Sequence, residues 1–266
     1  MNKVYCNKNN KIVCTYIDAS PEYWDEHWKK KITKDAVMST PKSWVYRLTK
    51  KYLCKGSRVL EGGCGTGQYV FSLKINGYDV YGVDYAKDTV SSINSILPEL
   101  KIEFGDINNL IFEDNYFDGY WSIGVIEHDW EGYESAAKEM YRVIKPGGYL
   151  FLSFPAISIL RKFKLYLSLY EENFFLTSKP VNFYQYILDK NDVISNFEKQ
   201  GFICVKSSWL GGFKGLKDEC SFLFNFLNFI NKSNNRLVRL LIFAFDIVIR
   251  SITGHSAILI LKKISL

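Results

Sequence analysis

Short apolar runs alternate with amphipathic repeats through the middle of the chain. Five apolar runs predict strands: one ends near Leu60, and the others cover about 79–84, 100–104, 118–123 and 149–154. Between the last two, apolar residues recur at helical spacing at Tyr133, Ala136, Ala137, Met140, Tyr141 and Ile144. Strands that alternate with helices through right-handed crossovers predict an α/β protein with a doubly wound sheet.

The flanks of this core carry weaker patterns. Residues 1–20 are expected to be irregular or to form a short strand pair. A helix is predicted over 23–34, with Ser20 as its cap and Pro21 in its first turn, and a second helix after Thr40-Pro41. Toward the end of the chain, the pattern predicts a helix from about 191 to 201 and strands over about 202–208 and 257–261.

We divide the chain into an N-terminal helical or lid segment (1–55), a core (56–155) and the second half of the sheet (156–266). Two inserts, about 156–187 and 211–253, exceed what the sheet needs. They follow strands at the carboxyl edge, where open α/β sheets bind ligands. Together with the helix over 23–34, they are expected to form a helical cap over a substrate pocket. The alternative is that they pack elsewhere or form a dimer interface.

The composition is that of a globular chain: 47% of the 266 residues are hydrophobic and 23% are charged. Six cysteines are scattered without a C-x-x-C pair, which favours reduced thiols over disulfides or a zinc site. His27, His128 and His255 lack metal-ligand spacing, so no metal is expected. The polar stretch after Met1 does not resemble a signal peptide, which favours a cytoplasmic protein.

Charge is unevenly distributed along the chain. Residues 1–60 hold 13 Lys and Arg against 5 Asp and Glu, residues 61–155 hold 6 against 15, and residues 156–266 hold 15 against 8. An acidic core therefore lies between two basic flanks. The flanks either are solvated lysine faces or meet an anionic substrate or surface.

A glycine-rich turn follows the first core strand. The sequence Arg58-Val59-Leu60-Glu61-Gly62-Gly63-Cys64-Gly65-Thr66-Gly67 ends a strand, makes the turn and opens a helix with free N–H groups. Asp84 ends the next strand, where its carboxylate can accept from both hydroxyls of a ribose. These features predict a nucleoside site. The glycines do not follow the G-x-G-x-x-G spacing, and Glu61 would repel a pyrophosphate, so an NAD-binding oxidoreductase is the weaker alternative.

Residues 58–155 resemble the class I S-adenosylmethionine-dependent methyltransferases. The likeness is greatest to the small-molecule group with a type 11 methyltransferase domain, which includes the ubiquinone and menaquinone biosynthesis methyltransferases. The matching stretches are L-E-G-G-C-G-T-G at 60–67, G-V-D-Y at 82–85, G-D-I at 105–107, F-D-G-Y-W-S-I-G-V-I-E-H at 117–128 and R-V-I-K-P-G-G-Y-L at 142–150. The resemblance implies a Rossmann-like seven-stranded sheet with an antiparallel last strand, and S-adenosyl-L-methionine as the cofactor of the 56–155 core.

By position in these motifs, the expected cofactor-binding residues are Glu61, Gly63, Cys64, Gly65, Gly67, Asp84, Tyr85, Asp106, Ile107 and Ser122. Glu61 is expected to act on the methionine ammonium, directly or through water, and the Ser122 carbonyl to accept from the same group. Asp84 is expected to bind the ribose. Tyr85 is expected to pack on the adenine, and Asp106 to accept from its amino group; helix capping is the alternative role of Asp106.

His128 follows the fourth core strand, where it is expected to face the transferring methyl group. It is a candidate general base for a hydroxyl or phenol; the alternative is a histidine that only orients its loop. The helix that carries Tyr23, Trp24, His27 and Trp28 could close over the sulfonium, because aromatic faces favour cations, or could be ordinary lid core.

These features predict a methyltransferase that acts on a small-molecule acceptor, with O-methylation favoured. A nucleic-acid methyltransferase is the second class, since the basic flanks permit it. However, S-I-G-V stands after the fourth strand in place of a D/N-P-P-Y motif, so no nucleic-acid partner is expected. The third class, a binding module without catalysis, is disfavoured by the intact first motif. The patterns specify no oligomeric state.

Apolar residues interrupted by basic ones fill parts of both inserts, over 157–167, 222–230 and 237–249. The later two runs are too short and too interrupted to span a bilayer, which needs about 20 apolar residues. They could lie in a membrane interface against anionic lipid, or pack together and build an apolar substrate pocket. A hydrophobic or lipid-linked acceptor reached at a membrane surface is therefore one hypothesis.

Overall fold

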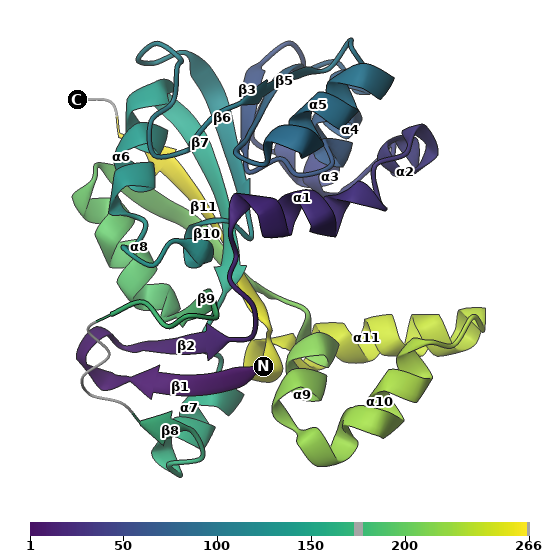
Figure 1. Cartoon of the computed structure of the whole chain (residues 1–266), viewed down its shortest axis with the longest axis vertical. Helices are drawn as coiled ribbons and strands as arrows, with labels where there is room; N and C mark the ends of the chain where they lie inside the picture. Colours follow the sequence, from purple (N-terminus) through teal and green to yellow (C-terminus); the bar gives the residue numbers. More distant parts are fainter. Residues whose placement is uncertain (173–177, 265–266) are drawn as a thin grey trace.

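A seven-stranded sheet forms the centre of the computed structural model, which describes residues 1–172 and 178–264 (Figure 1). Its strand order is β10-β11-β7-β6-β3-β4-β5, and β11 is antiparallel to both of its neighbours. The bounds are β3 Arg58–Gly62, β4 Asp79–Asp84, β5 Lys101–Phe104, β6 Phe117–Ile123, β7 Ile144–Pro155, β10 Phe202–Leu210 and β11 Ser256–Lys263. The predicted doubly wound, Rossmann-like sheet with an antiparallel last strand is confirmed.

Helices cover both faces of this sheet (Figure 1). One face packs against α3 (Trp44–Thr49), α4 (Gln68–Ile75) and α5 (Lys87–Ile96), and the other against α6 (Glu134–Val143) and α8 (Lys190–Lys199). Neighbouring strand residues point to opposite faces, so Tyr120 joins the core beneath α6 while Trp121 joins the core beneath α4. Burial on both faces explains why the strands read as continuous apolar runs.

A second, four-stranded sheet has the order β8-β1-β2-β9. The chain begins with an antiparallel pair, β1 (Asn2–Cys6) and β2 (Lys11–Thr15), joined by a 3-10 turn over Asn7–Asn9. Strand β2 pairs with β9 (Phe183–Leu188), and β1 with the short β8 (Glu171–Glu172). The N-terminal segment is therefore part sheet and part helix, and the first insert contains strands as well as its helix, α7 (Ile159–Tyr166).

The N-terminal helices are shorter than expected. Helix α1 (Pro21–Lys29) begins as predicted, because the Ser20 side chain accepts from the backbone N–H of Tyr23. It ends at Lys29 rather than at residue 34, and a separate helix, α2, spans Lys34–Met38. Helix α3 is capped by Ser43 and not by Thr40, since the Ser43 hydroxyl accepts from the Tyr46 N–H.

The second insert forms three helices, α9 (Gly212–Glu219), α10 (Phe224–Asn231) and α11 (Arg236–Thr253), with a 3-10 turn over Ser221–Leu223. Strands β10 and β7 are both antiparallel to β11, so β10 ends at the same edge as the parallel strands. The insert leaves the sheet at that edge, and α10 and α11 extend sideways from the body (Figure 1).

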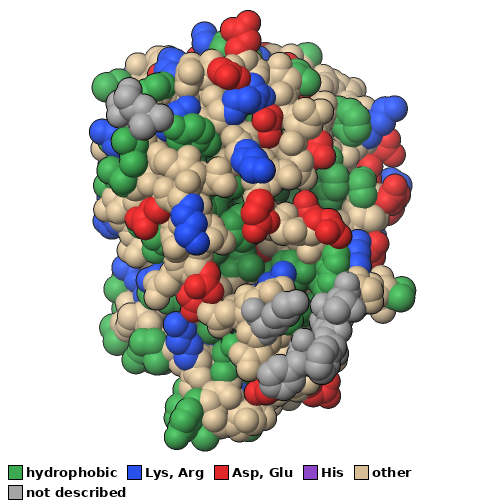
Figure 2. All heavy atoms as spheres, turned by 90° about the vertical axis from the view of Figure 1, so that its left-hand side faces the viewer, with side chains coloured by type: hydrophobic (Ala, Val, Ile, Leu, Met, Phe, Trp, Pro, Cys, Tyr) green, Lys and Arg blue, Asp and Glu red, His purple; other side chains and the backbone are tan. Residues whose placement is uncertain are grey.

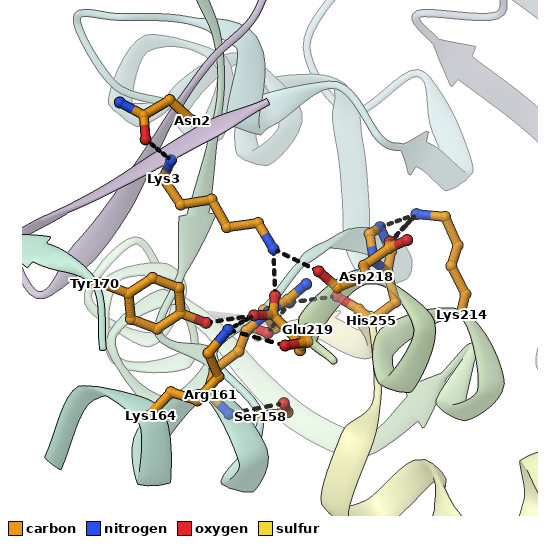
Figure 3. Close-up of polar contacts among 11 residues, drawn as sticks. Asn2, Lys3, Ser158, Arg161, Lys164, Tyr170, Lys214, Asp218, Glu219 and His255 are labelled. Atoms are coloured by element: carbon orange, nitrogen blue, oxygen red, sulfur yellow. Dashed lines mark hydrogen bonds and ion pairs between the residues drawn. The ribbon is translucent and has the colours of Figure 1, made fainter. Parts of the chain in front are cut away.

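A buried ionic cluster ties α9 to the body (Figure 3). The Glu219 carboxylate, 1% exposed, accepts from Arg161 at 2.8 Å, from Lys164 at 2.8 Å and from the Tyr170 hydroxyl at 2.6 Å, and it also pairs with Lys3. Burial opposes ionisation, but the surrounding cations outweigh it and hold the pKa of Glu219 well below its usual range. The base of the second insert is thus fixed to β1 and α7.

Candidate active site

A cavity of about 670 Å³ lies beyond the carboxyl ends of β3, β4, β5 and β6. Its walls are the loop segments that follow these four strands, with α1 on a further side. This is where open α/β sheets bind their ligands, and a volume between roughly 300 and 1,000 Å³ is typical of small-molecule sites. The position agrees with the predicted nucleoside site.

The glycine turn forms one wall of the cavity. Gly65 has a φ of +49°, a conformation that L side chains rarely adopt, and a Cβ there would lie 3.1 Å from the Trp28 ring. Gly63 also lines the cavity, whereas Gly67 caps α4 behind it. Cys64 is buried beside the turn outside the cavity wall, and burial raises the pKa of its thiol well above the usual value.

Asp84 joins the turn to the end of β4. Its two carboxylate oxygens accept from the backbone N–H of Gly65 at 2.7 Å and of Ala86 at 3.0 Å. Burial raises the pKa of Asp84, although these backbone donors oppose the shift. Since each carboxylate oxygen can accept more than one hydrogen bond, Asp84 keeps accepting capacity at the cavity wall that it lines.

Glu61 lies behind the turn and is not among the lining residues. Its side chain is 2% exposed, and Oε2 has no hydrogen-bond partner within the described part of the chain. Burial, with a smaller contribution from Asp84, raises the pKa of Glu61 well above its usual value. The Ser122 hydroxyl, one residue before the lining residue Ile123, is likewise buried without a partner among the described residues. Both side chains therefore have unused hydrogen-bonding capacity beside the cavity.

The next wall comes from the segment after β5. Asp106, Ile107 and Asn108 line it, and the Asp106 side chain accepts from the Asn108 N–H at 2.9 Å. Tyr85 also lines the cavity, and its hydroxyl donates to the Ala19 carbonyl at 3.0 Å, which connects the lead-in of α1 to the end of β4. Six expected cofactor residues thus meet at the cavity: Gly63, Gly65, Asp84, Tyr85, Asp106 and Ile107.

His128 lines the cavity from a 3-10 turn over Ile126–His128. Its Nδ1 lies 2.7 Å from the Tyr184 carbonyl oxygen, which can only accept, so Nδ1 carries the proton and Nε2 is left as an acceptor. Burial lowers the pKa of His128 to about 4. The imidazole is therefore neutral near pH 7, and β9 holds its orientation.

Helix α1 contributes two of its four expected lid residues. Trp24 and Trp28 line the cavity, with the centroids of their stacked rings 6.0 Å apart. The Trp24 and His128 rings lie edge to face, with centroids 5.0 Å apart. Tyr23 and His27 are not among the lining residues; they contact each other instead. The Asp25 carboxylate fixes the helix by accepting from the backbone and hydroxyl of Thr89 on α5.

Several lining residues were not predicted, among them Val125, Asp129, Trp130, Glu131, Ser178 and Lys179. Asp129, Trp130 and Glu131 directly follow His128, and the acidic and aromatic run I-E-H-D-W-E was the available signal. Residues 178–179 belong to the first insert, so that part of the expected cap is present. None of the described lining residues comes from 211–253, so the second insert does not contribute to the walls of this cavity.

Metal ligation has no support among the described residues: no group of three His, Cys, Asp or Glu side chains is placed to hold an ion. Carboxylates predominate among the charged side chains of the described lining, with Asp84, Asp106, Asp129 and Glu131. The one lysine among the described lining residues, Lys179, pairs with Asp18 at 2.9 Å.

The fold and the site together define a Rossmann-like nucleoside-binding enzyme. A methyltransferase domain model matches residues 60–152. Demethylmenaquinone methyltransferase from Staphylococcus aureus is 29% identical over 208 residues, which cover 70% of this chain and 78% of that protein. The chain is a methyltransferase with the class I Rossmann-like fold, similar to quinone biosynthesis enzymes, and the matches support S-adenosylmethionine as its cofactor.

Solved structures share this fold. A SAM-dependent methyltransferase from Archaeoglobus fulgidus has a TM-score of 0.56 at 19% identity and covers 91% of this chain and 100% of its own. Phosphoethanolamine N-methyltransferase 2 from Haemonchus contortus, in complex with S-adenosyl-L-methionine, has a TM-score of 0.57 at 17% identity. The match covers 92% of this chain and 58% of that protein. The site fits the cofactor, because Glu61 and Ser122 have buried polar atoms without a hydrogen-bond partner in the described part of the chain, beside a cavity of suitable size.

Proposed function

We propose that this methyltransferase transfers a methyl group to a hydroxyl of a small, hydrophobic acceptor molecule. The observation that carries the proposal is the neutral imidazole of His128, whose Nε2 is an acceptor at a cavity wall that also contains Trp24, Trp28 and Trp130. A hydroxyl can donate to Nε2, while the indole rings supply apolar surface for an aromatic or aliphatic body.

The positions of the side chains support the expected cofactor-binding roles. Asp84 accepts from the ribose hydroxyls, since it lines the cavity and keeps unused lone pairs. Asp106 accepts from the adenine amino group, and Tyr85 packs on the ring. Glu61 and the Ser122 carbonyl, which lie behind the turn, interact with the methionine ammonium. A cation near Glu61 would offset the cost of ionising this buried carboxyl.

His128 acts on the proton of the acceptor molecule. Bound S-adenosylmethionine supplies a methyl group made electrophilic by the sulfonium, and its sulfur keeps the bonding pair when the methyl leaves. Nε2 first accepts the O–H and aligns the oxygen. An oxygen that has just gained a methyl group is a strong acid, so a base with a pKa of about 4 suffices to take its proton. Before that step, the low pKa keeps His128 unprotonated and ready.

The charge of the cavity disfavours nucleic acid as the substrate. Four carboxylates line the cavity, and Lys179 is already paired with Asp18. Such a site repels phosphates, so basic flanks alone do not make a nucleic-acid enzyme. The relative from Staphylococcus aureus, a demethylmenaquinone methyltransferase, supports a hydrophobic acceptor, which is also compatible with lipid-linked molecules met at a membrane surface.

Cofactor selection is tested by equilibrium titration with S-adenosylmethionine, S-adenosylhomocysteine and NAD. We expect the first two to bind and NAD not to bind, because Glu61 and the glycine spacing disfavour a pyrophosphate. Binding of NAD at the same site would contradict the assignment of the turn.

A screen of hydroxyl, amine and carbon acceptors then tests the acceptor chemistry. His128→Asn keeps an N–H that can donate to the Tyr184 carbonyl but removes Nε2, so we expect a loss of roughly 10²–10⁴-fold in the chemical step and an almost unchanged affinity for S-adenosylhomocysteine. His27→Asn, on the lid helix outside the cavity, is the matched control. Wild-type turnover by His128→Asn on the identified acceptor would leave His128 with an orienting role only.

A further inference from the structure

Helices α10 and α11 carry a large apolar surface that the rest of the described chain does not cover. Between 43% and 83% of each of the following side chains is exposed: Phe222, Phe224, Phe226, Phe229, Leu237, Leu240, Leu241, Phe243, Phe245, Ile247, Val248 and Ile252. Single exposed apolar residues are ordinary, but a contiguous set of this size marks an interaction surface. We call residues 222–253 the helical projection.

Helix α11 has one packed face and one free face. Gly212 and Gly215 let α9 approach the backbone of α11 at Asp246, Arg250 and Thr253, where a Cβ on either glycine would collide. On the opposite side, Leu237, Leu241, Val248 and Ile252 follow a spacing of 4, 7 and 4 residues and share one face. This free face is apolar along the whole length of the helix.

The basic side chains of α11 lie on the other side of the helix from this free face, and they and their basic neighbours lack acidic partners among the described residues. Lys217, Lys232, Arg236, Arg239 and Arg250 make no salt bridge within the described residues.

The acidic residues near these cations are occupied elsewhere. Asp218 pairs with Lys214 and His255, Glu219 is held in its buried cluster, and the Asp246 side chain accepts from the Phe213 N–H. Acidic and basic side chains are instead interspersed on the face of the body that Figure 2 shows. The projection therefore combines an apolar face with uncompensated positive charge on its polar side.

We propose that the helical projection lies on the surface of an anionic lipid membrane, with the free face of α11 and the phenylalanines of α10 in the headgroup boundary. An amphipathic helix with aromatic and aliphatic residues on one side and arginines on its polar side has this mode of binding. No described helix is long and apolar enough to cross a membrane, which fits a helix parallel to the surface.

The geometry connects this surface to the active site without making it part of the cavity. The second insert leaves the sheet at the carboxyl edge, the same edge at which β3, β4 and β6 present the cavity. The buried Glu219 cluster fixes the base of the insert to β1 and α7 (Figure 3). Docking through the projection would therefore hold the cavity at a set position relative to the membrane, whichever acceptor it takes.

Co-sedimentation with vesicles tests the proposal. Vesicles of equal parts phosphatidylglycerol and phosphatidylcholine should pellet the full-length protein at low salt, and pure phosphatidylcholine vesicles should bind it at least tenfold more weakly. The double variant Leu241→Glu/Val248→Glu places charges on the free face and should lose at least tenfold in binding to the anionic vesicles. Ile111→Glu, which changes an equally exposed apolar residue outside the projection, should bind as the wild type does.

Two controls separate the outcomes. Calorimetric titration with S-adenosylhomocysteine reports whether each variant keeps its folded active site, and it distinguishes failure of the membrane proposal from failure of the proposed function. Analytical ultracentrifugation reports self-association. The proposal is wrong if the wild type stays in the supernatant with both vesicles, or if the double variant binds anionic vesicles like the wild type. If the wild type forms a dimer, the double variant is a monomer and neither binds vesicles, the free face is instead an interface with a second copy of the chain.

Discussion

Replacing Glu127 with glutamine should make the protein more stable at neutral pH. Glu127 lies in the 3-10 turn beside His128, is 1% exposed, and its Oε2 has no hydrogen-bond partner among the described residues. Burial raises the pKa of this carboxyl to about 8, against the weaker opposing effect of the Glu127 and Val125 backbone. Glutamine keeps the shape of the protonated side chain but has no charge to bury.

The magnitude follows from proton linkage. The folded protein holds the proton of Glu127 up to about pH 8, whereas an unfolded chain releases it near pH 4.3. The raised pKa thus contributes stability that is fully present below about pH 4 and is lost as pH rises through 8. Each pKa unit corresponds to about 1.4 kcal/mol, so the roughly 2.7 units between the unfolded pKa and pH 7 amount to a loss of roughly 4 kcal/mol. Glu127→Gln should remove this loss.

Thermal unfolding of both proteins at several pH values checks this prediction. The melting temperatures of the two proteins should differ little near pH 4.5 and by roughly 8–16 °C at pH 7, since 1 kcal/mol shifts a domain of this size by about 2–4 °C. Glu113→Gln, which changes an exposed carboxylate, should show no such divergence. A constant offset between Glu127→Gln and the wild type across this range would refute the assignment of a buried, protonated carboxyl.

Three further substitutions probe the site and its frame. Asp84→Ala should weaken S-adenosylhomocysteine binding by about 1.5–3 kcal/mol in calorimetry, and unchanged affinity would remove Asp84 from the cofactor site. Gly65→Ala should also weaken cofactor binding and change tryptophan fluorescence, because its Cβ would press on Trp28 from a positive φ. Glu219→Gln should cost about 3–5 kcal/mol in urea unfolding at pH 7, since Arg161 stays buried without its counter-charge. Because the pKa of Glu219 is depressed in the fold, this difference should shrink as pH falls below about 4.

The seven-stranded sheet could be predicted from the sequence because its strands are buried on both faces. Strand β4, for example, has the bounds that its apolar run and terminal Asp84 indicate. The position of Asp84 at the cavity also follows, because residues at the carboxyl end of a parallel strand face the ligand edge. Local pattern and topology are sufficient for these features.

Long-range pairing and side-chain direction were not predictable in this way. The pairing of β2 with β9 joins residues about 170 positions apart, and the sequence of neither strand indicates which strand it pairs with. Glu61 matches its motif by position, yet packing turns its carboxyl behind the glycine turn rather than into the cavity. The apolar runs of the second insert are compatible with a buried cap or a free face, and only the tertiary contacts distinguish the two.

The hydrogen bond between His128 and the Tyr184 carbonyl makes the active site dependent on the order in which the chain is synthesised. Strand β9, which carries Tyr184, forms its sheet with β2 near the N-terminus. At about 5–20 residues per second, β2 leaves the ribosome roughly 10–30 s before β9 does. During that interval the β1–β2 hairpin lacks its neighbour and His128 lacks its anchor, so exposed strand edges could attract chaperones. Methyltransferase activity should therefore arise only after most of the chain has been made, even though the glycine turn and Asp84 are complete much earlier.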